Sequence, residues 1–516
     1  MKPIRLMAGF FTVGIWTLLS RLMGFIRDIM IAGYLGTGIV AEAFLVAFSL
    51  PNLFRRFFAE GAFNMAFVPM FSKKLEGGDD PARFAQDAFV GMAFILTVFT
   101  SIGIMAMPAL VLAMASGFAD DARFDLAVTY GRIAFPYILF ISLSALLSGV
   151  LNANGRFVAA AAAPVLLNVI FILAVVITAL TMDPTTFDIG TSLAWAVPVA
   201  GVAQLALVFI AARRAGFPMR LQMPKLTPDL RKLAMIAAPA ALAGGVVQIN
   251  LLVGRQVASF FDGAVAWLNY ADRLYQLPLG VVGIAIGVVL LPDLSRKLRA
   301  GDDAGGRDAF NRASELSLAL TIPAAVALIA IPVPLVAVLF ERGAFTAQDT
   351  AATALAVAIY GLGLPAFVLQ KTLQPLFFAR EDTKRPFYYA LFAMVLNLVL
   401  AIGLSYQFGF IAAAIGTTMT GWAMVVLLAN GARSMGDAAK FDARFRSRIW
   451  RIVLASVAMG AILIGVNMLL TPLFALGSLR YLALIILIAT GIIAYFGIGH
   501  ICGAFRLGDF RRALRR

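Results

Sequence analysis

Apolar segments of about 20 residues or more, separated by short charged or Gly/Pro-rich gaps, repeat along the whole chain. A segment of this length can cross the hydrocarbon core of a bilayer as an α-helix. The pattern predicts fourteen such helices, at residues 6–34, 39–72, 83–114, 123–151, 157–181, 190–212, 230–260, 263–295, 310–340, 347–379, 384–405, 410–433, 447–470 and 478–505. The chain is therefore predicted to be an all-α polytopic membrane protein.

Composition supports this fold class, and the position of the charges orients the helices. Hydrophobic residues make up 61% of the chain, charged residues only 13%, and the mean hydropathy is +0.92. The gaps on one side of the predicted helices carry 31 lysines and arginines, and those on the other side carry three. Because lysine and arginine accumulate on the cytoplasmic side, both termini are predicted to be cytoplasmic, with the first helix uncleaved. The net charge of +15 is spread over the gaps, which argues against nucleic-acid binding.

An internal repeat predicts how the helices are organised. The segment VPMFSKKLEGGDD (68–80) resembles LPDLSRKLRAGDD (291–303). Three residues of the first half recur 229 positions later, namely Pro136, Arg156 and Asn168 at Pro365, Arg385 and Asn397. Six-helix repeats of parallel topology predict two six-helix lobes around a central cavity. The predicted parts are an N-terminal lobe (1–220), a C-terminal lobe (221–440) and two extra helices (441–516).

The first predicted helix contains charges where hydrocarbon should surround it. Arg21, Arg27 and Asp28 interrupt an apolar segment, and each costs about 2.5–3.5 kcal/mol at the centre of a bilayer. At 100° per residue these three and Gly24 fall within a 120° sector of the helix, where Gly24 leaves room between the two guanidinium groups. This face is expected to line a polar cavity.

The second predicted helix repeats this arrangement. Pro51 can kink it, and Asn52, Arg55, Arg56 and Glu60 follow within three turns. Arginine presents a planar fork of donors that matches phosphate oxygens, so arginines between two lobes predict a site for phosphate or diphosphate. The candidate substrate-binding residues are Arg21, Arg27, Asp28, Arg55 and Arg273, with Gly24, Glu42, Asn52, Glu60 and Asp272 as supporting residues.

A second interpretation of these arginines is structural. They can pair with Asp28, Glu42, Glu60 and Asp272 and hold helices together, as Arg56 and Glu60 can do at a spacing of four residues.

The sequence gives little support for a metal site or for catalysis. Cys502 and His500 are the only cysteine and histidine, so no metal site and no cofactor is predicted. The chain has no Walker A loop, H-E-x-x-H helix or G-x-S-x-G elbow, so it is not predicted to be an enzyme.

Four segments resemble the MurJ/MviN lipid II flippases, and the resemblance extends over essentially the whole chain. They are SRLMGFIRD (20–28), EAFLVAFSLPNLFRRFFAEGAFNMAFVP (42–69), YADRLYQLPLGVVGIAIGVVLLPDLS (270–295) and ERGAFT (341–346). The resemblance implies two lobes in a V around a cationic cavity, with the last two helices forming a groove for the lipid tail. The family's essential cavity arginines correspond to Arg21, Arg27, Arg55 and Arg273.

The same resemblance implies a transporter of the bacterial inner membrane. Its substrate would be lipid II, the undecaprenyl-diphosphate-linked disaccharide pentapeptide, flipped to the periplasmic leaflet by alternating access. This step serves peptidoglycan biosynthesis, cell wall biogenesis and cell shape, with membrane lipids and candidate cell-wall synthesis proteins as other partners. Two departures concern ion coupling: Gln276 stands where relatives carry an acid, and the seventh predicted helix lacks the acid of a sodium site.

Two other kinds of function are alternatives to lipid II transport. A cation-coupled multidrug exporter, or an exporter of another lipid-linked oligosaccharide, belongs to the same multidrug/oligosaccharidyl-lipid/polysaccharide superfamily. A drug exporter is expected to bind its cationic substrates with acids rather than with a surplus of arginines. A membrane glycosyl- or phosphotransferase would show a cluster of acids with metal-ligand geometry at the membrane edge. The pairs Asp79–Asp80 and Asp302–Asp303 are better explained as solvated repeat loops.

Overall fold

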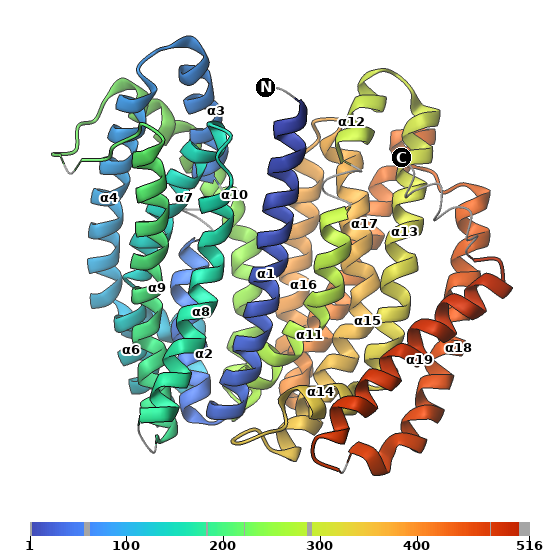
Figure 1. Cartoon of the computed structure of the whole chain (residues 1–516). Helices are drawn as coiled ribbons and strands as arrows, with labels where there is room; N and C mark the ends of the chain where they lie inside the picture. Colours follow the sequence, from blue (N-terminus) through green and yellow to red (C-terminus); the bar gives the residue numbers. More distant parts are fainter. Residues whose placement is uncertain are drawn as a thin grey trace. The chain divides into compact units, whose positions relative to one another are not determined.

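A computed structural model describes most of the chain as helices. The described residues are 3–55, 62–181, 184–220, 222–285, 291–474 and 476–504, and this part contains α- and 3-10 helices but no strand. Each of the fourteen predicted segments overlaps one or two of the α-helices, which confirms the predicted all-α class (Figure 1). Within the described part, nine helical stretches are long and apolar enough to cross a membrane. The chain is a multi-pass membrane protein.

The chain packs as two compact units. The first unit contains Met1–Ala266 together with Arg342–Phe345, and the second contains Trp267–Glu341 and Thr346–Arg516. The helix count placed the boundary between the predicted lobes at residue 220, whereas the boundary by packing follows residue 266. Helix α10 (Pro228–Ser259) causes this difference, because it packs against helices of the first unit. The lobes deduced from the repeat stay a prediction.

The first unit is a bundle of helices coloured blue to light green in Figure 1. Besides α10 it contains α1 (Pro3–Leu35), α2 (Ile39–Arg55), α3 (Ala62–Gly77), α4 (Pro81–Met105), α5 (Met107–Met114), α6 (Ala122–Ala134), α7 (Tyr137–Ala153), α8 (Val158–Thr181) and α9 (Thr186–Arg214). Helix α1 packs mainly against α8, and α8 against α9, so the charged face of α1 is brought onto α8.

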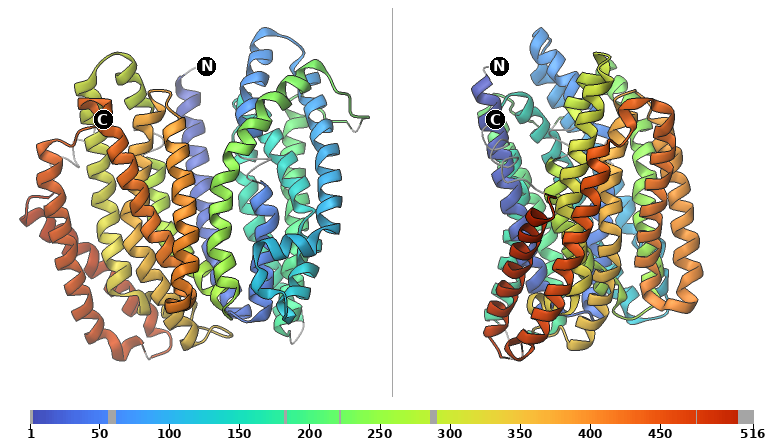
Figure 2. Two further views of the ribbon diagram at one scale, coloured as in Figure 1. Left: turned by 180° about the vertical axis from the view of Figure 1, so that it is seen from behind. Right: turned by 90° about the vertical axis from the view of Figure 1, so that its right-hand side faces the viewer.

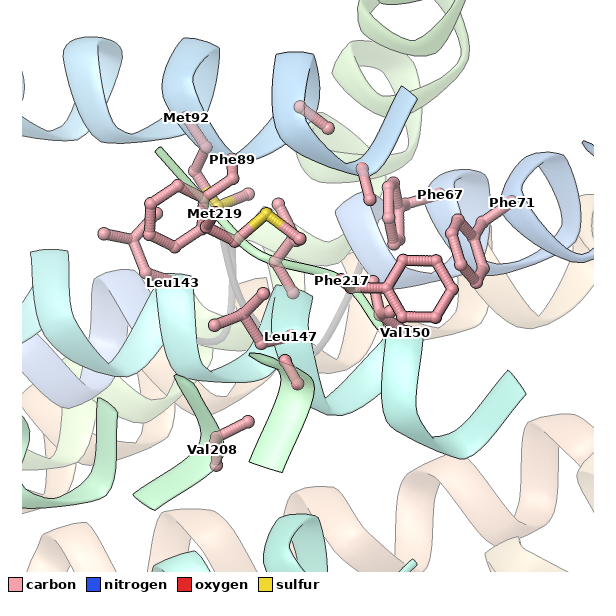
Figure 3. Close-up of a cluster of buried hydrophobic side chains, with 14 of the residues drawn as sticks. Phe67, Phe71, Phe89, Met92, Leu143, Leu147, Val150, Val208, Phe217 and Met219 are labelled. Carbon is pink, nitrogen blue, oxygen red and sulfur yellow. The ribbon is translucent and has the colours of Figure 1, made fainter. Parts of the chain in front are cut away.

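An aromatic core holds α3, α4, α7 and α9 together (Figure 3). The rings of Phe67 and Phe71 on α3 lie 5.6 Å apart, and Phe67 stacks on Phe84 of α4 at 5.5 Å. Phe217, in the segment that follows α9, closes the cluster against Phe71 at 5.6 Å. Lipid tails are as apolar as these side chains, so close packing rather than exclusion from water stabilises this contact.

The second unit contains the remaining helices. They are α11 (Ala264–Ala285), which begins in the first unit, α12 (Leu291–Arg299), α13 (Asp303–Ala330), α14 (Pro332–Phe340), α15 (Ala347–Phe378), α16 (Lys384–Phe408), α17 (Ala412–Ala432), α18 (Ala443–Phe474) and α19 (Leu479–Ile501). Helices α18 and α19 lie side by side, in orange and red in Figure 2. Tyr495 of α19 donates a hydrogen bond to the carbonyl oxygen of Ala319 at 2.5 Å and so fixes this pair on α13.

Three of the predicted segments are broken by proline. Met107–Pro108 begins α5, Pro136 precedes α7, and Pro332 begins α14. Proline lacks a backbone N–H and fits the first turn of a helix, so each of these three prolines lies at or just before the start of a new helix, whereas Pro164 and Pro198 lie inside the unbroken helices α8 and α9.

Candidate functional site

Arg27 lies buried on α1, where the sequence predicted a polar cavity. Its side chain donates to Asp28 Oδ1 from Nε at 3.0 Å and from Nη2 at 2.7 Å, and from Nη1 to Asn168 Oδ1 at 2.9 Å. Its guanidinium also lies 5.5 Å from the centre of the Phe171 ring. Only 7% of Arg27 and 6% of Asp28 is exposed, so the pair is held inside the bundle. Two partners and an aromatic face thus fix one cation in an apolar environment.

Small residues on α1 allow this arrangement. A Cβ atom on Gly24 would lie 3.5 Å from the amide of Asn168, so α1 and α8 are in contact at this glycine. The Asn168 amide also donates from Nδ2 to the carbonyl oxygen of Ser20 at 2.9 Å. Asn168 is therefore bonded to both helix backbone and guanidinium, and it sets the direction in which Arg27 points.

The other predicted cavity residues of the first unit occupy separate positions. Arg21 is exposed on α1. Asn52 donates to the carbonyl oxygen of Phe48 at 2.8 Å, and Arg55 is half-buried at the end of α2. Glu60, like Arg56, lies outside the described residues, so their predicted pairing stays a prediction.

Glu42, a predicted supporting residue, forms a different buried ion pair. It is 1% exposed, and its Oε2 lies 2.8 Å from Nη1 of Arg123 on α6, while its Oε1 accepts from the backbone N–H of Val265 at 2.9 Å. Arg123 also reaches Asp121 and, at 3.0 Å, Asp262. Burial opposes ionisation of Asp121, but hydrogen bonds from Arg123 outweigh it and lower the pKa of that carboxyl.

In the sequence, Arg123 counts only as one of the three cations in the gaps on the non-cytoplasmic side of the predicted helices. The structure adds a packing role, because Arg123 is 6% exposed and its guanidinium lies 4.5 Å from the centre of the Phe118 ring. It joins α2, α6 and the start of α11 in one ionic cluster. An aspartate two residues before Arg123 was a visible signal, since Asp121 caps α6 and binds the same arginine.

Arg273 and Asp272 lie on α11 in the second unit, both half-buried. Asp272 accepts a hydrogen bond from the amide of Gln276, one turn further along the helix. The neighbouring Tyr275 packs against Tyr360 and Phe367 of α15, with ring centres 5.1 and 5.7 Å away. Both α1 and α11 thus carry arginine and aspartate side chains within an otherwise apolar helix.

The sequence analysis missed Asn168 as a site residue. It appeared there only as a member of the repeat, because an asparagine in an apolar helix carries no charge to mark it. Within the described residues, no group of three or more His, Cys, Asp or Glu side chains could hold a metal ion.

Comparison with known proteins gives one consistent family. The family model described as "Lipid II flippase MurJ" matches residues 31–488. The "Probable lipid II flippase MurJ" of Rhizobium tropici is 43% identical over 520 residues, covering 99% of this chain and 97% of that protein. The "Lipid II flippase MurJ" of Burkholderia cenocepacia is 39% identical over 391 residues, which is 74% of this chain and 75% of that protein.

Solved structures agree with this result. A lipid II flippase MurJ in an inward closed conformation superposes with a TM-score of 0.77 at 25% identity, over 98% of this chain and 99% of that chain. An inward-facing multidrug transporter of the MATE family gives a TM-score of 0.65 at 16% identity, over 82% of this chain and 96% of that chain. At that identity the second similarity concerns the fold alone.

Proposed function

Because the chain belongs to the lipid II flippase MurJ family, we propose that it moves lipid II from the cytoplasmic to the periplasmic leaflet of the bacterial inner membrane by alternating access. It is a transporter and not an enzyme. The observation that carries the proposal is the buried Arg27 with its partners Asp28 and Asn168. A cation kept inside an apolar bundle favours an anionic substrate over the cationic drugs of an exporter.

We propose that Arg21, Arg27, Asp28, Arg55 and Arg273 form the diphosphate site. Of the five N–H groups of the Arg27 guanidinium, three donate to Asp28 and Asn168, which leaves two for phosphate oxygens. Gly24, Glu42, Asn52, Glu60 and Asp272 support this site. Arg273 and Asp272 belong to the second unit.

The test is complementation. The full chain is expressed in a bacterium depleted of its own lipid II flippase, and growth and cell shape are scored. Rescue by the wild type, with loss of rescue by Arg27→Ala at equal membrane levels, is expected. Failure of the well-expressed wild type to restore growth, together with no lipid II flipping by purified protein in vesicles, would refute the function.

Both termini are proposed to be cytoplasmic, as the uneven distribution of lysine and arginine indicates. In a Cys502→Ser background, Tyr406→Cys should react with an impermeant thiol reagent from the periplasm and Lys440→Cys should not. Tyr406 is 89% exposed, so neighbouring side chains would not shield a cysteine there from the reagent. The opposite labelling would contradict the orientation. Cell-wall synthesis proteins are proposed as further partners because they use the flipped product.

A further inference from the structure

The first unit contains a large cavity away from the Arg27 cluster. Its volume is about 1740 Å³, and it lies between α1, the end of α3, the turn from α7 to α8, and the end of α9. We name it the α1–α9 cavity. Small-molecule sites usually have volumes of roughly 300–1,000 Å³, so this one has room for a large, branched ligand. Its polar and aromatic lining includes Trp16, Glu76, Asn152, Arg156 and Arg214.

Two arginines at the edge of the cavity have no acidic partner in the described part of the chain. Nη1 of Arg156 donates to the backbone carbonyl oxygen of Arg214 at 3.3 Å, which joins the turn before α8 to the end of α9, and both residues line the cavity. Among the described side chains, no carboxylate lies within 4.0 Å of either guanidinium, that of Glu76 in the same cavity included. The cavity therefore offers the positive charge of two arginines to a ligand inside it.

The corresponding turn in the second unit treats its arginine differently. The turn between α15 and α16 also contains a left-handed residue three positions before its second helix, with φ of 61° at Glu381 against 70° at Gly155. There the next residue is Asp382, and it pairs with Arg385 at 3.2 Å. The turn of the first unit instead places Arg156 directly after the glycine. The second unit thus pairs Arg385 with an aspartate, whereas the first unit leaves the charge of Arg156 at the α1–α9 cavity.

The face of α1 that lines the cavity also leads to Arg27. Trp16, Ser20, Gly24 and Arg27 are spaced by four, four and three residues, so they lie along one face of the helix. The eleven residues from Trp16 to Arg27 span about 16 Å of helix axis at 1.5 Å each. An extended pentapeptide alone reaches about 17 Å, so a headgroup attached to a diphosphate at Arg27 can reach the cavity.

Resting on the proposed function, we propose that the α1–α9 cavity binds the disaccharide-pentapeptide headgroup of lipid II. Arg156 and Arg214 bind the carboxylate groups of the peptide, for which the guanidinium fork is matched. Trp16 offers a flat apolar face to the sugar rings. Glu76, which also lines the cavity, is left to accept from the N–H groups of the peptide. The site distinguishes the complete substrate from its bare lipid carrier.

The experiment compares two ligands that share the tail and the diphosphate. Purified full-length protein is titrated with lipid II and with undecaprenyl diphosphate, which lacks the sugars and the peptide. Arg156→Gln and Arg214→Gln should each weaken lipid II binding about tenfold, equivalent to about 1.4 kcal/mol, and leave undecaprenyl diphosphate binding unchanged. Asn152→Asp adds a negative charge to the cavity without a change of shape and should act in the same way.

Two controls make the result specific. Arg385→Gln, at the corresponding end of the second unit, should leave the binding of both ligands unchanged, and Arg27→Ala should weaken both. Equal loss of both ligands in the Arg156 and Arg214 variants, or unchanged lipid II binding in all three cavity variants, would overturn the inference. So would selective loss of binding to vesicles of anionic phospholipid, which would assign the cavity to membrane lipid. If the wild type binds neither ligand, the proposed function itself fails.

Discussion

Replacing Arg27 tests whether the buried guanidinium is a binding group or only a structural one. Arg27→Ala removes the two guanidinium N–H groups that Asp28 and Asn168 leave available for phosphate oxygens. Hydrogen bonds to charged groups contribute about 1.5–3 kcal/mol each, and they are not additive, so lipid II binding should weaken by about one to two orders of magnitude. Arg27→Lys keeps the charge but loses the planar fork, so it should restore binding only in part.

The same substitution also affects folding, because Asp28 and Asn168 lose a partner. Removing one member of a buried ion pair can cost about 3–5 kcal/mol of unfolding free energy, so thermal unfolding in detergent must accompany every binding titration. Asn168→Ala separates the two effects: it keeps the charge of Arg27 and removes the hydrogen bond that orients it. We expect this variant to fold and to bind lipid II several-fold more weakly. Near-normal binding and flipping by well-inserted Arg27→Ala and Arg273→Ala proteins would show that both arginines are structural.

Two further predictions concern stability. Arg123→Ala leaves Glu42 buried without its cation and should lower the unfolding free energy by about 3–5 kcal/mol, whereas Arg132→Ala, exposed on the same helix, should change it by less than about 0.5 kcal/mol. Gly36→Ala forces an alanine to φ of 61° and should cost about 1–3 kcal/mol, because its Cβ would also lie 2.4 Å from a backbone oxygen. Gly38→Ala has open space and serves as the control. Thermal unfolding is measured for each variant and its control. Equal destabilisation by the Arg123 and Arg132 variants would refute the ion pair with Glu42, and equal destabilisation by the Gly36 and Gly38 variants would refute the close contact at Gly36.

The helices could be predicted well because a membrane span leaves a strong signal of length and hydropathy. The breaks at Pro108, Pro136 and Pro332 were also visible in the sequence, but a break in an apolar segment does not show by itself whether the chain turns back or continues. Packing between distant segments was not accessible. Helix α10 belongs with the first unit by its contacts, and helix counting alone could not show this.

The candidate site could be predicted only where charge marks it. Arg27 and Asp28 stand out in α1 because their insertion costs free energy, and the structure places both inside the bundle. The pairing of Arg27 with Asp28 matches the structural interpretation as well as the binding one, so both remained open. The contact of Arg27 with Asn168 and that of Glu42 with Arg123 depend on which helices pack together. The two partners are separated by 141 positions in the first case and by 81 in the second, so the local sequence gives no sign of either contact.

The loop Arg342–Phe345 has a consequence for synthesis of the protein. It packs with the first unit: the backbone N–H of Ala344 donates to the carbonyl oxygen of Gly33 at 2.8 Å, and Gly36 lies against the backbone of Ala344. About 300 residues separate the two segments, and at about 5–20 residues per second the loop is made about 15–60 s after the corner it covers. The end of α1 therefore lacks its contacts with this loop while most of the later helices are inserted. The first unit is complete only after the ribosome has passed residue 345.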